Sequence, residues 1–315
     1  MLPWTLLLAA LPLSPGLESV LEGGDFVATP KGFRMITLSH VADGCAARAQ
    51  EDPAGARDCV ERVYRRARRL PAQTGLAKTH LLLILGAGDR TGPCLDPKRH
   101  HTLAESLAAG SLADPDHHLP SYPGPKDRWP ADQAATLAGL HRYDQAHQGH
   151  TLAPVSAAFS ARILDRAIDP ATQLPWSEVN GRGTGKWPRG CALSYSIRYL
   201  AEADPALAAR WWAPYRAQYL VDRGVLVGFR EWPPGVERRA DVDSGPIVEG
   251  VGAAATAFGI GAARAMGEEL LAWRLTATAH TVGALAAQVP TLAKASQSTL
   301  AEAILFWATA PLAAR

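Results

Sequence analysis

A Trp-Pro pair, preceded each time by a charged residue, closes a polar or glycine-rich loop at three places in this chain. The three copies are Arg128-Trp129-Pro130, Lys186-Trp187-Pro188 and Glu231-Trp232-Pro233. A long segment rich in Ala, Gly and Ser follows each copy, either at once or across a short loop. Repetition of one phrase ahead of one kind of segment, tens of residues apart, indicates a repeat architecture. We therefore expect helical hairpins arranged in a ring, with the three loops meeting at one mouth.

The helical pattern along the chain favours alternating inner and outer helices. Small residues permit close helix approach, so we expect Ala- and Gly-rich helices on the inside. We expect helices at residues 36–50, 56–70, 102–109, 131–145, 155–168, 192–202, 206–221, 247–267, 268–288 and 296–308, and loops at 86–97, 114–128, 180–186 and 230–245. The apolar run 79–85 fits either a buried helix end or a strand. The sequence thus predicts an all-α fold, an (α/α) toroid of about five to six helical hairpins.

Composition fits one folded domain and excludes a broad surface for polyanions. Of the 315 residues, 47% are hydrophobic and 20% are charged, which is the balance of an ordinary globular protein. The 32 basic and 30 acidic residues leave a formal net charge of +2, so nucleic acid is not an expected partner. We expect residues 17–315 to form a single toroid domain.

The first sixteen residues have features of a secretory leader. The apolar run from Thr5 to Leu11 is too short to span a bilayer and ends at Pro12, Pro15 and Gly16. No Lys or Arg precedes it, and the small-residue cleavage pattern is poor. Residues 1–16 are expected to be a signal or leader segment of a periplasmic or extracellular protein, with a cytoplasmic protein as the alternative. No other stretch is apolar and long enough for a transmembrane helix.

The four cysteines, Cys45, Cys59, Cys94 and Cys191, allow three pairings that sequence alone does not distinguish. Cys45 and Cys59 flank a turn and could face each other across a helical hairpin. A disulfide there would suit an exported protein. The alternative is that both are buried thiols that pack as small hydrophobic side chains.

Five short phrases have a distinctive pattern: Leu38-Ser39-His40, Ser121-Tyr122-Pro123-Gly124, Trp129-Pro130-Ala131-Asp132, Gly190-Cys191-Ala192-Leu193-Ser194 and Asp241-Val242-Asp243-Ser244-Gly245-Pro246. With them, most of the chain resembles a group of poorly characterised bacterial proteins with the (α/α)6 toroid of the linalool dehydratase/isomerase type. The resemblance implies a toroid and, for its chemistry, acidic residues, a histidine and cysteines in a cavity at the helix ends. Of the catalytic residues that the resemblance implies, only Asp132 and Cys191 can be assigned in this chain.

Two aspartates after the third Trp-Pro pair are candidates for acid/base catalysis. Asp241 and Asp243 lie one residue apart, with Glu231 ten residues upstream. Mutual repulsion in such a cluster raises the pKa of one carboxyl group, which can then act as a general acid while another acts as the base. Asp243 and Ser244 would alternatively cap a helix that starts near Pro246, which leaves Asp241 as the stronger candidate.

Asp132, Cys191 and His40 complete the predicted catalytic set. Asp132 lies in the first turn of its helix, where the helix dipole alone would also explain an anion. His40 is expected either to line the cavity or to be a hydrogen-bonded histidine of the core.

The predicted substrate-binding residues are Tyr122, Trp129, Trp187, Arg189, Glu231 and Trp232. Aromatic faces beside a carboxylate suit sugar rings and other substrates with apolar faces. Core packing is the alternative role of the tryptophans.

No metal site and no cofactor are expected. Seven of the ten histidines fall between His100 and His150, including the pairs His100-His101 and His117-His118. Adjacent histidines do not present two ligands on one face of a helix, as a metal site requires.

The sequence as a whole predicts an exported acid/base enzyme, a lyase or isomerase of the dehydratase type that acts on a small alcohol. The alternatives are a hydrolase or lyase that acts on a glycan, and a non-catalytic envelope binding protein with the same cleft. A glycosidase would place two carboxyl groups roughly 5 to 10 Å apart across the cleft. The expected partner is a small molecule or a glycan, and the oligomeric state stays open.

Overall fold

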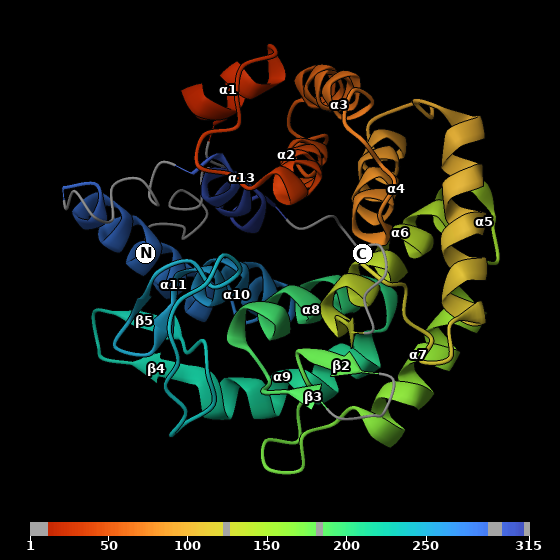
Figure 1. Ribbon diagram of the computed structural model, residues 1–315. Coiled ribbons are helices and arrows are strands. Elements are labelled where there is room, and N and C mark those ends of the chain that lie inside the picture. Colours follow the sequence, from red (N-terminus) through yellow and green to blue (C-terminus); the bar gives the residue numbers. More distant parts are fainter. Residues whose placement is uncertain (1–11, 122–126, 181–184, 289–297, 312–315) are drawn as a thin grey trace.

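The computed structural model describes residues 12–121, 127–180, 185–288 and 298–311. Within them, six helices form a closed inner ring in which each packs against two neighbours (Figure 1). The inner helices are α2 (Arg34–Ala46), α4 (Gly75–Asp89), α6 (Pro130–His147), α8 (Gly190–Ala203), α10 (Ala253–Ala265) and α13 (Thr299–Ala308). Outside them lie α1 (Pro15–Leu21), α3 (Pro53–Ala67), α5 (Pro97–Ala113), α7 (Leu152–Arg166), α9 (Pro205–Tyr219) and α11 (Glu269–Ala286). The predicted all-α toroid is confirmed.

The inner helices all begin at the same end of the ring. Residues just before or within the first two turns of each inner helix line one common cavity. The chain returns to that end through an outer helix after each inner one, apart from the closing helix α13. This parallel arrangement brings together loops that are far apart in the sequence.

Asp-Pro pairs start three of the outer helices. Asp52, Asp96 and Asp204 are the N-caps of α3, α5 and α9, and each side chain accepts a backbone N–H of the first turn at 2.9 to 3.1 Å. The proline that follows has a fixed φ suited to the first helical position, where no N–H donor is needed. The same pair also prevents a helix from continuing into it from the N-terminal side, because a residue that precedes proline avoids the helical conformation.

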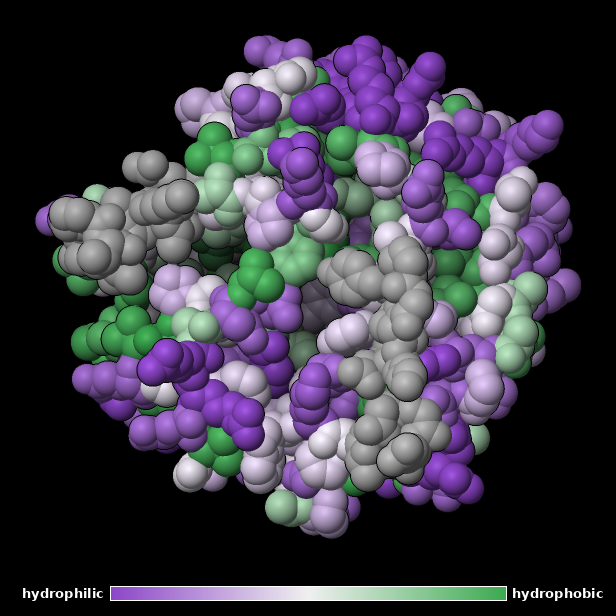
Figure 2. Space-filling view, viewed as in Figure 1, coloured by the Kyte–Doolittle hydropathy of each residue, from purple (hydrophilic) through white to green (hydrophobic). Residues whose placement is uncertain are grey.

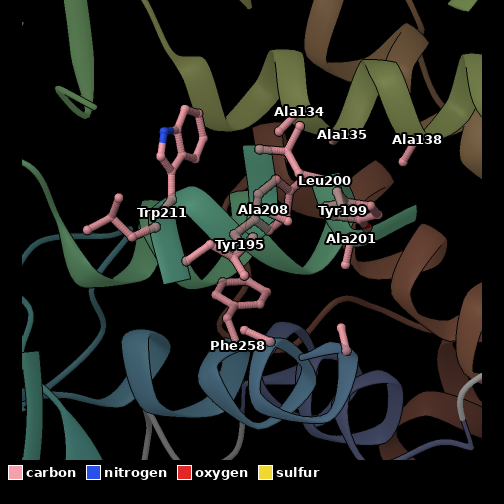
Figure 3. Close-up of a cluster of buried hydrophobic side chains, with 14 of the residues drawn as sticks. Ala134, Ala135, Ala138, Tyr195, Tyr199, Leu200, Ala201, Ala208, Trp211 and Phe258 are labelled. Carbon is pink, nitrogen blue, oxygen red and sulfur yellow. The ribbon is translucent and has the colours of Figure 1, made fainter. Parts of the chain in front are cut away.

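Alanines allow the inner helices to pack closely. Ala134, Ala135 and Ala138 of α6 are fully buried, and Figure 3 shows them on the side of α6 that faces α8. The opposing surface of α8 carries large side chains, among them Tyr199 and Leu200, which are also fully buried. Small residues on one helix thus accommodate large ones on its neighbour, as close packing of an interior requires.

A three-stranded antiparallel sheet joins two of the Trp-Pro loops. β1 (Asp127–Arg128), directly before Trp129, pairs with β2 (Glu178–Asn180), and β2 pairs with β3 (Gly185–Lys186), directly before Trp187. The predicted loop 180–186 is therefore partly a strand, and its residues 181–184 lie outside the described residues.

The third Trp-Pro loop is held against the start of α8. The Gly190 N–H donates to the Glu231 carbonyl at 2.8 Å. A Cβ atom at position 190 would lie 1.9 Å from the carbonyl oxygen of Arg230, so only glycine permits this approach.

Several predicted boundaries are wrong. α10 begins at Ala253, because residues 247–252 form a hairpin of β6 (Ile247–Val248) and β7 (Val251–Gly252). Residues 220–221, expected at the end of a helix, belong to β4 (Leu220–Asp222), which pairs with β5 (Val227–Phe229). The run 79–85 is helical, since α4 continues to Asp89.

The two ends of the described chain close the ring, and one disulfide ties an inner helix to an outer one. The Thr299 N–H donates to the Val27 carbonyl at 3.1 Å, which ties the segment after α1 to the start of α13. Cys45 of α2 and Cys59 of α3 form a disulfide with their Cα atoms 6.1 Å apart. Residues 1–11 of the predicted leader lie outside the described residues. No described helix is both long and apolar enough to cross a bilayer.

The disulfide generates the first prediction. Replacing both cysteines, Cys45→Ala with Cys59→Ala, should lower the free energy of unfolding by about 3 kcal/mol, because the crosslink closes a short loop in the unfolded chain. Urea denaturation measures this loss. A reductant should lower the stability of the wild-type protein by a similar amount and leave the double variant unchanged. Equal stability of the wild-type protein with and without reductant would contradict the prediction.

Candidate functional site

A cavity of about 790 Å³ opens at the end of the ring where the inner helices begin. In Figure 2 it lies in the hollow near the middle of the face, bordered by both hydrophilic and hydrophobic residues. Its volume is in the range of small-molecule binding sites. Because the N-terminus of a helix carries partial positive charge, the inner helices make this end favourable for anionic groups.

The three tryptophans of the Trp-Pro loops all line this cavity, as predicted. Trp187 is 39% exposed and lies at the rim. Four further aromatic residues that were not identified from the sequence line the same cavity: Phe33, Trp176, Tyr195 and Phe258. Trp176 precedes β2, so the sheet that joins the first two loops also brings this ring to the mouth.

Arg189 binds three carboxylates at the rim. Its Nε donates to Glu231 at 2.7 Å, Nη2 donates to Asp241 at 2.7 Å, and Nη1 lies 3.5 Å from Asp243. The guanidinium carbon also lies 4.9 Å from the centre of the Trp232 ring, a cation–π arrangement. One side chain thereby holds the third Trp-Pro loop and both predicted catalytic aspartates in place.

Glu231 is fully buried behind Arg189 and does not line the cavity itself. Its carboxylate accepts hydrogen bonds from the Cys191 N–H at 3.3 Å and the Cys191 thiol at 3.1 Å. Burial raises the pKa of Glu231, and the hydrogen bonds and the charge of Arg189 oppose this rise. Burial and the neighbouring Glu231 carboxylate also raise the pKa of the Cys191 thiol well above its usual value, so the thiol stays neutral.

Asp132 is the carboxyl group of the cavity that has no ion-pair partner among the described residues. It projects from the first turn of α6 and accepts a short hydrogen bond from the Ser121 hydroxyl. Burial, with a smaller contribution from the charge of Asp243, raises its pKa to about 6. A carboxyl group with such a pKa is partly protonated near neutral pH and can donate a proton.

Asp241 and Asp243 differ in their environments although both line the cavity. Burial opposes the ionisation of Asp241, but hydrogen bonds from Arg189 and from the Ser244 N–H, at 2.9 Å, hold its pKa below the usual value. Burial raises the pKa of Asp243, and Arg189 only partly offsets this. The alternative helix-capping role of Asp243 and Ser244 is not observed, because α10 begins after Gly252.

His40 and Tyr122 are not part of the described cavity. His40 is fully buried beside the indole of Trp307, with 4.6 Å between the ring centres, and neither ring nitrogen has a hydrogen-bond partner in the described structure. Burial lowers the pKa of His40 well below its usual value, so the ring is neutral. Tyr122 lies outside the described residues.

A buried chain of hydrogen bonds reaches the cavity through a residue that the sequence analysis did not weigh. The Ser39 hydroxyl lies 2.5 Å from His80 Nδ1, and His80 Nε2 lies 3.0 Å from the hydroxyl of Tyr195, which lines the cavity. Burial lowers the pKa of His80 to about 3, so its ring is neutral and orients the tyrosine. A polar residue inside the apolar run 79–85 was the signal that could have identified it.

No known protein family matches the sequence, and neither does any curated protein. Solved structures do share its fold. An α-mannanase of glycoside hydrolase family 76 from Bacteroides thetaiotaomicron aligns with a TM-score of 0.58 at 8% identity, over 89% of this chain and 85% of the other. A family 76 glycoside hydrolase from a bovine strain of the same species gives 0.57 at 10% identity, over 91% and 69%. An α-amylase from Clostridium perfringens gives 0.55 at 8%, over 86% of each chain. At these identities the likeness establishes the (α/α)6 toroid alone.

The network around Arg189 leads to a second prediction. Arg189→Met should lower the free energy of unfolding by about 3 kcal/mol or more at pH 7, because Glu231 would remain as a buried charge without a partner. Without the arginine, Glu231 should bind a proton in the folded state at a higher pH than in the unfolded chain. The free energy of unfolding of the variant should therefore fall as pH rises from the pKa of Glu231 in the unfolded chain to its higher pKa in the folded state.

Urea denaturation at several pH values measures both effects. The matched control is Arg189→Met combined with Glu231→Gln, which removes the buried charge and should recover much of the lost stability. A double variant no more stable than the single one would show that Glu231 does not depend on Arg189 for its charge.

Proposed function

We propose that the protein is a glycan-acting hydrolase that uses Asp132 as its general acid and Asp243 as the second carboxylate. The observation that carries the proposal is the raised pKa, about 6, of an acid without an ion-pair partner in the described, aromatic-lined cavity. A non-catalytic binding protein would have its carboxylates neutralised by arginines or used as caps, as Asp241 is by Arg189. Asp132 departs from that pattern.

The comparisons favour hydrolysis over the dehydratase chemistry that the sequence resemblance implies. Two solved structures with this fold are described as family 76 glycoside hydrolases, and a third as an α-amylase. None of these three is described as a dehydratase or isomerase. The disulfide between Cys45 and Cys59 supports an exported protein, because such bonds persist in oxidising compartments.

In the proposed reaction, the protonated carboxyl group of Asp132 donates its proton to the glycosidic oxygen while the bond from that oxygen to the anomeric carbon breaks. The carboxylate of Asp243 either removes a proton from a water that attacks the anomeric carbon, or attacks that carbon itself and forms a covalent intermediate. In the second case water then cleaves the bond to Asp243, with the Asp132 carboxylate removing the proton of that water. The separation of the two carboxyl groups decides between these routes. Arg189 Nη1 lies 3.5 Å from the Asp243 carboxylate and helps to hold it at the rim. The faces of Trp129, Trp187 and Trp232 are available to stack on sugar rings.

The proposal is tested with a panel of glycans, by measuring the release of reducing ends. Asp132→Asn should lower kcat by about a hundredfold or more, because the amide cannot donate the proton, and Asp243→Asn should cause a similar loss. Asp222→Asn is the control, since Asp222 pairs with Arg274 away from the cavity. Activity that survives in Asp132→Asn would refute the assigned acid. Glycan binding without turnover by the wild-type protein would favour the binding-protein alternative.

The same carboxyl group predicts a specific dependence on pH. Since catalysis needs protonated Asp132, kcat/KM should fall as pH rises through about 6. The folded state also holds this proton at pH values where the unfolded chain, with a pKa of about 3.9, has released it. Ionisation of Asp132 should thus destabilise the wild-type protein as pH rises through the same window.

Asp132→Asn removes that ionisation, so the variant should be more stable than the wild-type protein by about 2 kcal/mol at pH 8 and show little gain at pH 4. Urea denaturation at the two pH values gives the comparison. A variant less stable than the wild-type protein at pH 8 would mean that the pKa of Asp132 is not raised.

A further inference from the structure

We propose that the protein holds a structural zinc ion, bound by Asp89, Cys94, His100 and His147. One potential ligand atom from each of these residues lies within 4.8 Å of all the others. From the sequence we expected no metal site, because adjacent histidines do not present two ligands on one face of a helix. The folded chain instead takes one histidine of the His100-His101 pair and combines it with His147, far along the sequence.

Three of the separations between the potential ligand atoms are close to those of a tetrahedral zinc site. With bonds of about 2.0 Å to nitrogen and 2.3 Å to sulfur, two nitrogen ligands should lie roughly 3.3 Å apart, and a nitrogen and a sulfur roughly 3.6 Å apart. His147 Nε2 and His100 Nδ1 lie 3.2 Å apart, and Cys94 Sγ lies 3.7 Å from His100 Nδ1. Asp89 Oδ2 lies 3.2 Å from His100 Nδ1 and 2.8 Å from His147 Nε2.

Direct hydrogen bonds explain this cluster less well than a metal does. Both histidines direct a ring nitrogen at the same oxygen of Asp89, and those two nitrogens also lie within hydrogen-bonding distance of each other. If each nitrogen carried a proton for Asp89, the two protons would be held close together. The other oxygen of Asp89 is buried and has no hydrogen-bond partner among the described residues. A cation at the centre would use all four groups without this conflict.

The burial and composition of the cluster suit zinc. His100 is fully buried, and the side chain of Asp89 is 7% exposed. Two imidazoles, a thiolate and a carboxylate form a donor set that fits Zn²⁺ and is too soft for Mg²⁺ or Ca²⁺, which prefer oxygen ligands only. Four protein ligands leave no open position for a substrate, which is typical of a structural site.

The location of the cluster indicates what the metal would do. Asp89 ends α4, Cys94 lies in the connection to α5, His100 lies in the first turn of α5, and His147 ends α6. Figure 1 shows these three helices on one side of the ring. α4 and α6 begin at the cavity, with Leu76 and Asp132, and their far ends are roughly 20 Å away at 1.5 Å per residue. The ion would fix those ends and take no part in the chemistry of the cavity.

The test uses the full chain without an affinity tag, stripped with a chelator and then titrated with Zn²⁺ or Co²⁺. We expect one equivalent of metal to bind, and Co²⁺ to produce the intense thiolate-to-cobalt absorption of a cysteine ligand. Zn²⁺ at a hundredfold excess over its Kd should raise Tm by roughly 5 °C. Bound metal should also slow the reaction of Cys94 with a thiol reagent; the only other free cysteine, Cys191, is buried.

Variants distinguish metal binding at the four proposed ligands from unspecific metal binding elsewhere on the protein. Cys94→Ser should abolish the cobalt–thiolate absorption, and His100→Ala should abolish the zinc-dependent rise in Tm. The matched control is His101→Ala, because His101 is adjacent but its ring hydrogen-bonds to Tyr143 at 2.7 Å; it should retain both effects. Circular dichroism confirms that each variant is folded. Absence of stoichiometric metal binding by the wild-type protein would overturn the proposal, as would a cobalt spectrum that Cys94→Ser leaves unchanged.

Discussion

The ion pair between Arg189 and Glu231 is the interaction on which the arrangement of the cavity depends. A fully buried carboxylate is stable only with a cation and hydrogen-bond donors close by, and Arg189 and the start of α8 supply both. The pair fastens the third Trp-Pro loop to α8. The remaining nitrogens of the same guanidinium hold Asp241 and Asp243 at the rim, and its face covers Trp232. The third Trp-Pro loop, the two aspartates and the Trp232 ring therefore all depend on the side chain of Arg189.

The ring of helices stabilises the negative charge of the acidic groups at the mouth. Six inner helices of the described structure direct their N-termini to the mouth, where partial positive charge favours carboxylates. Their close packing relies on alanines such as Ala134 and Ala135, which leave room for large side chains of α8 such as Leu200. A stiff wall of this kind holds a side chain such as Asp132 in one position, and positioning is the first requirement of acid/base catalysis.

The carboxyl groups of the mouth differ in whether a cation lies beside them. Arg189 lies beside Glu231, Asp241 and Asp243, whereas Asp132 has only the Ser121 hydroxyl as a partner in the described structure. The pKa of Asp241 is therefore lowered and that of Asp132 is raised to about 6. Near neutral pH Asp132 is therefore partly protonated, whereas Asp241 is ionised. The proposed metal ligands lie at the far ends of α4 and α6, away from these carboxyl groups.

Much of the architecture was determined by local sequence. Asp-Pro pairs start outer helices, Ala- and Gly-rich segments become inner ones, and the repeated Trp-Pro phrase marked loops that do meet, because these signals act within a few residues of the chain. Tertiary structure decided which side chains share a space. Trp176 and Tyr195 line the cavity, His40 lies in the core, and Asp89 lies beside His147. These positions depend on the rotation of each helix about its axis and on the pairing of distant strands. Those quantities arise from packing among helices, and no short stretch of sequence contains them.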